Sequence, residues 1–233
     1  MYFNNFNHFR FKINFRKMIK SPLHKARSKY IPKLPKSFEE NVALISGEPS
    51  EAIADKEAIK QIFPKTYGLP LVTFEAGEAS ENQILNVGVV LSGGQAPGGH
   101  NVISGLFDAL KKLNNRNHLF GFIGGPDGLL NNSFIELDSA IVSEHRNTGG
   151  FDIIGSGRTK IEDEASYDKV IVNCLKNNIN ALVIVGGDDS NTNACVLAEY
   201  FTEKKAGIQV IGCPKTIDGD LKNDFIETSF VRF

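Results

Sequence analysis

Three apolar runs in this chain are each followed at once by a loop rich in glycine or acidic residues. The runs are 86–91, 181–185 and 209–211, and the loops are 92–99, 186–190 and 214–220. Each run is short enough for a buried strand, and helical patterns lie between them. This alternation predicts an α/β fold, a parallel sheet with helices on both faces. Ligands of such sheets bind beyond the carboxyl ends of the strands, where all three loops fall.

The remaining elements are expected from apolar spacing and turn residues. Helices are expected over 101–113, 166–176 and 191–200, and further strands over 119–123 and 208–211. Ser166 is the expected N-cap of the second helix, with Val170, Cys174 and Leu175 pointing inward. The first helix has one apolar stripe, which consists of Val102, Leu106, Ala109, Leu110 and Leu113. The glycine-rich segment 124–128 is expected to be a turn.

The composition of the chain argues against several classes of function. The net charge of −1 indicates neither a nucleic-acid partner nor a membrane surface. No apolar run approaches the ~20 residues that span a bilayer. The three cysteines lack paired metal-ligand spacing and are expected to be reduced, which favours a cytoplasmic protein.

Charge and proline content divide the chain into four expected parts. Residues 1–20 form a basic leader rich in Phe and Asn, and Met18 is an alternative start. Residues 21–83 form an arm that packs on the main domain, with a helical segment over 50–62 stopped by Pro64. Residues 84–230 form the main α/β lobe, and 231–233 a short tail.

The first loop favours an anion. It contains two Gly-Gly pairs, Gly93-Gly94 and Gly98-Gly99, around a proline. It is neither a Walker A loop nor a dinucleotide fingerprint. Bare N–H groups beside a helix N-terminus bind phosphate well, although an ordinary strand-to-helix turn is the alternative.

The other two loops carry the carboxylates. Asp188 and Asp189 are adjacent at a strand end, where they fit either Mg²⁺ with bound phosphates or a capped helix start. Asp218 and Asp220 share a face in extended backbone, so one can take a proton from a substrate hydroxyl. An Asx-type turn with solvated acids is the alternative there. Lys215 and Arg158, the latter in a Gly-Ser-Gly-Arg segment, can meet phosphate charge.

Together these motifs resemble the phosphofructokinase family over 86–230, and within it the long-chain, pyrophosphate-dependent type. The resemblance implies a Rossmann-like N-terminal lobe with Mg²⁺ as cofactor. It also implies the following roles: Gly93, Gly94, Gly187, Asp189 and Ser190 bind pyrophosphate, Asp188 holds Mg²⁺, Asp218 is the base, Asp220 supports it, Thr216 and Ile217 contact the sugar substrate, and Arg158 and Lys215 stabilise charge.

The implied reaction moves phosphate from pyrophosphate to the 1-hydroxyl of fructose 6-phosphate, a step of glycolysis. Asp189 and Lys215 stand where ATP-using relatives have glycines, which favours pyrophosphate over ATP. The intact acidic motifs favour a catalytic, beta-like subunit over a regulatory one, and full-length relatives are expected to be homo- or hetero-oligomers. An ATP-dependent phosphofructokinase and a non-catalytic phosphate-binding module remain the alternatives.

The resemblance stops after Phe230. The family continues there into a second lobe that grips the sugar phosphate, whereas this chain ends with Val231-Arg232-Phe233. We therefore expect an incomplete copy, inactive by itself and poorly soluble through exposed sheet edges.

Overall fold

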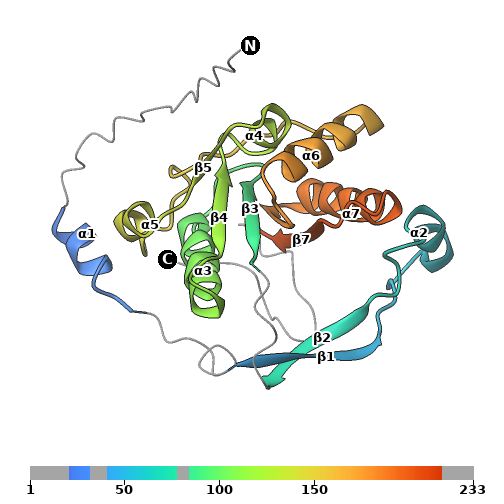
Figure 1. Ribbon diagram of the computed structural model, residues 1–233, viewed down its shortest axis with the longest axis horizontal. Coiled ribbons are helices and arrows are strands. Elements are labelled where there is room, and N and C mark those ends of the chain that lie inside the picture. Colours follow the sequence, from blue (N-terminus) through green and yellow to red (C-terminus); the bar gives the residue numbers. More distant parts are fainter. Residues whose placement is uncertain (1–20, 32–40, 78–83, 217–233) are drawn as a thin grey trace, which may run out of the picture.

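The computed structural model describes residues 21–31, 41–77 and 84–216 (Figure 1). The expected leader 1–20, the tail 231–233 and the acidic segment 217–220 lie outside the described residues. Within the described ranges, no helix combines the length and apolarity needed to cross a membrane.

The main lobe is built on a five-stranded sheet with the order β5-β4-β3-β6-β7. The strands are β3 (Asn86–Leu91), β4 (His118–Phe122), β5 (Phe134–Glu136), β6 (Ala181–Gly186) and β7 (Gln209–Pro214). β3 pairs in parallel with β4 and β6, and β6 pairs in parallel with β7. The predicted strands and their parallel pairing are thus confirmed.

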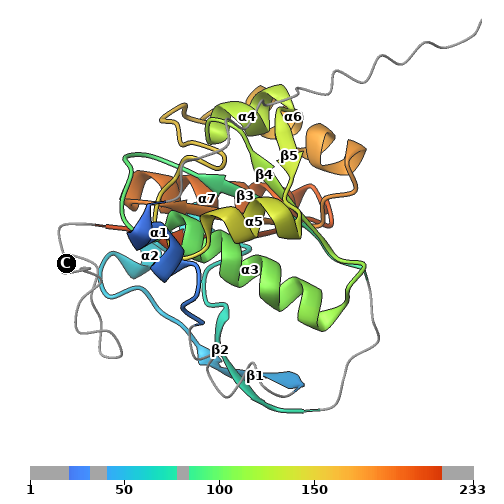
Figure 2. The ribbon, with the colours of Figure 1, turned by 90° about the vertical axis from the view of Figure 1, so that its left-hand side faces the viewer.

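Helices cover both faces of this sheet (Figures 1 and 2). They are α3 (Gly99–Leu113), α4 (Pro126–Asn131), α5 (Ser139–His145), α6 (Glu164–Lys176) and α7 (Asp188–Glu203). Alternate residues of β3 enter two separate cores. Val89 packs in the core beneath α3 and α5, whereas Val90 packs in the core beneath α4, α6 and α7. Continuous apolar runs are therefore needed, because both faces of each central strand are buried.

The expected α/β fold class is confirmed, although the sheet is mostly rather than wholly parallel, because one edge strand runs antiparallel. β5 pairs antiparallel with β4, with Gly121 opposite Ile135. β5 has only three residues, which are too few for an alternation of apolar and polar residues to predict a strand. The segment 124–128, expected to be only a turn, also contains the start of α4, because Pro126 occupies the first helical turn, where proline is tolerated.

Three side-chain assignments in the helices were wrong. Ser166 is not the N-cap of α6: Asp163 is, and the two form a reciprocal capping box. Val170 and Cys174 are fully buried as expected, but Leu175 is 54% exposed. In α3 the buried residues include Ile103 and Phe107, whereas Leu113 at the end of the expected stripe is exposed.

The described parts of the arm contain two helices and two antiparallel strands, which are called the hairpin below although a helix lies between them. They are α1 (Pro22–Arg27), β1 (Val42–Pro49), α2 (Lys56–Ile62) and β2 (Pro70–Ala76). The antiparallel pair β1–β2 forms its own sheet, which the sequence analysis did not anticipate. Figure 2 shows this hairpin below the main sheet.

The arm is joined to the main lobe through polar contacts that lie outside the expected helical segment 50–62, whose Ile53 and Ile62 are exposed. Glu199 of α7 accepts hydrogen bonds from the backbone N–H groups of Lys65 and Thr66, at 2.8 and 2.9 Å. Asn147 donates its amide to the carbonyls of Arg27 and Tyr30, at 2.9 and 2.7 Å. Side chains of the main lobe therefore hold two separate segments of the arm.

Candidate functional site

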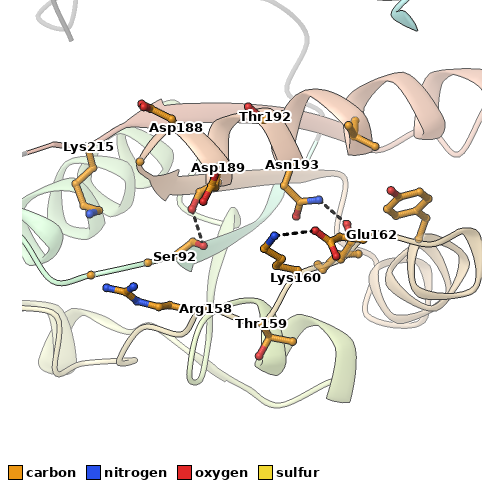
Figure 3. A pocket seen from close by; sticks show the side chains of 17 residues that line it. Ser92, Arg158, Thr159, Lys160, Glu162, Asp188, Asp189, Thr192, Asn193 and Lys215 are labelled. Atoms are coloured by element: carbon orange, nitrogen blue, oxygen red, sulfur yellow. Dashed lines mark hydrogen bonds and ion pairs between the residues drawn. The ribbon is translucent and has the colours of Figure 1, made fainter. Parts of the chain in front are cut away.

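One open pocket lies beyond the carboxyl ends of β3, β6 and β7 and has a volume of about 750 Å³ (Figure 3). Three segments of the chain line it: the start of the loop after β3, residues 158–162, and the β6–α7 junction with the first turns of α7. Tyr167 and Lys215 complete the lining. The pocket is where the parallel sheet was predicted to bind its ligand.

The loop after β3 turns sharply at the pocket. Ser92 still donates its N–H to the Val185 carbonyl at 2.7 Å, as a strand residue would. Gly93 then adopts a φ of +82°, a left-handed conformation that favours glycine. Ser190 donates its hydroxyl to Ser92 Oγ at 2.8 Å, which ties this loop to α7.

Several N–H groups of this loop are already paired within the protein. Gly93 donates to the Gly157 carbonyl at 2.8 Å, and Gly98 and His100 donate to the carbonyls of Gly149 and Gly150 at 2.8 and 2.9 Å. The start of α3 is therefore capped by carbonyl oxygens of a neighbouring segment. Gly94 lines the pocket, whereas Gly98 does not. Gly94 lies beside Arg158, because a Cβ on Gly94 would meet Arg158 Nη2 at 3.4 Å.

Arg158 reaches the pocket from a segment built of glycines. Gly157 forms a parallel bridge with Ser92. A Cβ on Gly157 would lie 2.2 Å from the Gly124 carbonyl oxygen, so only glycine fits at this crossing. Arg158 follows directly, and its side chain is exposed at the pocket (Figure 3).

The opposite wall is the N-terminus of α7. Asp188 and Asp189 lie in its first turn, and both are exposed. Asn191 donates its amide to the carbonyls of Gly186 and Gly187, at 2.7 and 2.9 Å, and so fixes the strand-to-helix turn. The dipole of this 16-residue helix adds positive potential at the pocket.

Lys215 closes the pocket from the end of β7. Its N–H donates to the Gly186 carbonyl at 2.8 Å, which extends the β6–β7 ladder by one residue. Partial burial lowers the pKa of Lys215, and the positive charge of Arg158 lowers it further. The two cations thus share one region of the pocket, and they would be stabilised by an anion between them.

Lys160 is a pocket residue that the sequence analysis missed. Its Nζ forms an ion pair with Glu162 at 3.1 Å. This pair raises the pKa of Lys160, and the charge of Asp189 adds to the effect. The signal in the sequence was its spacing, since Lys160 follows Arg158 by two residues in the same loop.

The donor set at α7 suits Mg²⁺. Within the described ranges no three His, Cys, Asp or Glu side chains gather into a metal site. Mg²⁺ needs no such cage, because one or two carboxylates and the phosphates of a substrate usually hold it. Asp188 and Asp189, both at the pocket, therefore fit the ion.

The pocket brings together most of the predicted site residues. It contains Gly93, Gly94, Arg158, Gly187, Asp188, Asp189, Ser190 and Lys215. Thr216 is described but does not line the pocket. Ile217, Asp218 and Asp220 lie outside the described residues, so their roles stay predictions.

A mostly parallel sheet whose strand-end loops surround one pocket with glycines, cations and two carboxylates defines an α/β lobe with a ligand pocket at its strand ends. The phosphofructokinase family model matches residues 86–229. The chain belongs to the phosphofructokinase family.

Two relatives within this family show a high sequence identity to the chain. It is 59% identical over 214 residues to the pyrophosphate--fructose 6-phosphate 1-phosphotransferase of Porphyromonas gingivalis, an alignment that covers 91% of this chain and 39% of that protein. It is 50% identical over 200 residues to subunit beta 2 of the Arabidopsis thaliana enzyme, with 84% and 35% covered. The chain thus spans well under half of the length of either relative.

A solved structure shares the fold. The crystal structure of a pyrophosphate-dependent phosphofructokinase from Nitrosospira multiformis matches with a TM-score of 0.54 at 25% identity, over 58% of this chain and 35% of that chain.

Proposed function

We propose that this chain is the pyrophosphate-binding lobe of a phosphotransferase that moves phosphate from pyrophosphate to the 1-hydroxyl of fructose 6-phosphate. The observation that carries the proposal is the convergence of Arg158, Lys215 and the N-terminus of α7 on one pocket. Phosphoryl transfer depends mainly on positioning and on neutralising charge. The names of the relatives at 59% and 50% identity support the same donor and acceptor.

Within this proposal, each wall of the pocket has its own task. Arg158 and Lys215 neutralise the phosphates, and their mutual repulsion is relieved when an anion binds. Gly94 lets the backbone approach the ligand closely. Asp188 and Asp189 would hold Mg²⁺, which supplies charge neutralisation on the phosphate oxygens when bound. Asp218 is proposed as the base that accepts the proton of the sugar hydroxyl, with Asp220 beside it.

Asp189 distinguishes this proposal from an ATP-dependent one. Its carboxylate lies in the first turn of α7 at the pocket. A donor longer than pyrophosphate, such as ATP, would be obstructed there by the bulk of this carboxylate and repelled by its negative charge. We expect the chain to bind pyrophosphate with Mg²⁺ at least about tenfold more tightly than ATP.

The test is calorimetric titration of both donors into the chain and two variants. Asp189→Gly removes bulk and charge, whereas Asp189→Asn removes the charge alone. We expect Asp189→Gly to reduce the preference for pyrophosphate about tenfold and Asp189→Asn to reduce it less. Equal affinity of the unmodified chain for the two donors would contradict the proposal. Because the chain is expected to be inactive by itself, the non-catalytic alternative is tested after joining it to the second lobe of a relative: tight pyrophosphate binding without transfer to fructose 6-phosphate would then favour a phosphate-binding module.

We also propose the cytoplasm as the compartment and glycolysis as the process. Cys174, Cys195 and Cys213 are free thiols, which suits a reducing environment. A beta-like catalytic role is supported by the identity to the Arabidopsis beta 2 subunit. Assembly with further subunits belongs to this proposal as well.

A further inference from the structure

His100 lies behind the phosphate pocket, in the first turn of α3, and is 1% exposed. Both of its ring nitrogens have partners. Nδ1 lies 2.6 Å from Thr148 Oγ1, and Nε2 accepts the Ile153 N–H at 3.3 Å. The Thr148 hydroxyl donates its own proton to the His145 carbonyl at 2.6 Å. It must therefore accept from Nδ1–H, which leaves Nε2 as an acceptor.

The segment that His100 holds runs alongside the glycine loop and leads to Arg158. At one end it accepts the N–H groups of Gly98 and His100, and at the other Gly157 accepts the N–H of Gly93. There is no spare room along this contact. A Cβ on Gly99 would lie 2.7 Å from the Gly150 carbonyl oxygen, and one on Gly150 would lie 2.9 Å from His100 Cε1.

We propose that His100 is a positioning residue for phosphate binding: by accepting the Ile153 N–H, its Nε2 fixes the segment 149–157 and thereby aims Arg158 into the pocket. His100 does not line the pocket itself, so it acts through Arg158. The inference rests on the proposed function, because the aim of Arg158 matters only where an anion binds.

Burial favours the neutral, accepting ring, whereas a nearby carboxylate favours a proton on it. Two titratable groups face it: Asp152, with Oδ1 3.1 Å from Nε2, and His145, whose ring centroid lies 5.0 Å away, edge to face. A proton on Nε2 would be donated to Asp152 and would leave the Ile153 N–H without its acceptor. Burial lowers the pKa of His100 to about 4, with Asp152 opposing the shift and His145 adding to it. Near neutral pH the ring is therefore neutral and can accept.

Amide hydrogen exchange on the 233-residue chain, without ligand, tests the contact itself. His100→Gln can place an amide oxygen near the position of Nε2, whereas His100→Asn reaches only towards Thr148. We expect His100→Asn to raise exchange across 149–158 about tenfold and His100→Gln to leave it close to that of the unmodified chain. Ile103→Val, one turn along α3 and equally buried, controls for a general loss of packing. Unchanged exchange in His100→Asn would overturn the proposal.

Titration with inorganic pyrophosphate and Mg²⁺ tests the connection to Arg158. We expect His100→Asn to weaken binding about tenfold when Arg158 is present and to add nothing in an Arg158→Ala background. Losses that add in the double variant would overturn the positioning role. An unmodified chain that binds no pyrophosphate would overturn the proposed function instead, and the exchange experiment would still decide whether His100 fixes the segment.

Discussion

Lys215 and Arg158 show how a single pair of residues can reduce stability while serving a ligand. Both carry positive charge at the same pocket, and the pKa of Lys215 is lowered by burial and by Arg158. A lowered lysine pKa means that the fold disfavours the charged form. The cost is therefore present in full at neutral pH, declines as the pH rises through the lowered pKa and is gone above the ordinary lysine pKa of 10.5. An anion bound between the two cations would offset their mutual repulsion and so reduce this loss of stability.

Lys215→Met should consequently have opposite effects on stability and on binding. We expect the unliganded chain to gain less than about 1 kcal/mol at pH 7, because solvent at the open pocket screens the charges. Pyrophosphate binding should weaken about tenfold or more through the lost charge-assisted contact. Urea denaturation and calorimetric titration measure the two effects. Lys112→Met, an exposed lysine in the last turn of α3, is the charge-matched control and should change neither.

At the scale of elements, the central strands and the long helices were predictable because each carries its own pattern. β3, β6 and α3 are long enough for apolar spacing to identify them. β5 and the hairpin β1–β2 were missed for different reasons. β5 is three residues long, and the hairpin has no buried face to impose alternation.

The site was predictable to the extent that its residues follow strands directly. Gly94, Asp189 and Lys215 were found because strand ends meet at one edge of a parallel sheet. Lys160 and His100 were not, because neither follows a strand. What joins His100 to the pocket is a contact with Ile153, 53 residues away, which no local pattern encodes.

The attachment of the arm to α7 depends on one carboxylate. Glu199 is 9% exposed and accepts hydrogen bonds from the N–H groups of Lys65 and Thr66 and from the Thr66 hydroxyl. We expect Glu199→Ala to destabilise the chain by about 1–3 kcal/mol, because these hydrogen bonds to a charged and buried acceptor are lost. Limited proteolysis should then cleave preferentially within the range 41–77. Glu203→Ala, one turn further along the same helix and exposed, is the control. Equal cleavage in both variants would contradict this account.

At the scale of the whole molecule, the pH dependence of stability should include a contribution from His100. Its pKa falls from about 6.5 to about 4 on folding, mainly through burial, so the unfolded chain binds the extra proton between these values. Its contribution is therefore present in full above pH 6.5 and is lost as the pH falls towards 4. Urea midpoints measured at pH 7, 5.5 and 4 should show a decline that is smaller in His100→Gln. A decline of the same size in the variant would count against this assignment.

The hairpin β1–β2 leaves apolar side chains on the surface. Leu44 and Phe74 are cross-strand partners and are 68% and 55% exposed, and Val72 on the same face is 48% exposed. Contiguous apolar surface of this kind promotes association. We expect Leu44→Thr with Phe74→Thr to reduce concentration-dependent aggregation, measured by light scattering. Ile53→Thr removes a fully exposed side chain outside the hairpin and should have little effect.

The close glycine contacts beside the pocket restrict how its specificity can be changed. At Gly157 backbone meets backbone, because a Cβ there would lie 2.2 Å from the Gly124 carbonyl oxygen. The backbone position from which Arg158 starts is therefore set by peptide geometry. The opposite wall, with Asp189 and Lys215, is made of side chains on an exposed helix start and a strand end. Any redesign of the pocket for a different donor can therefore exchange side chains on both walls, whereas the backbone beside Arg158 cannot move to follow them.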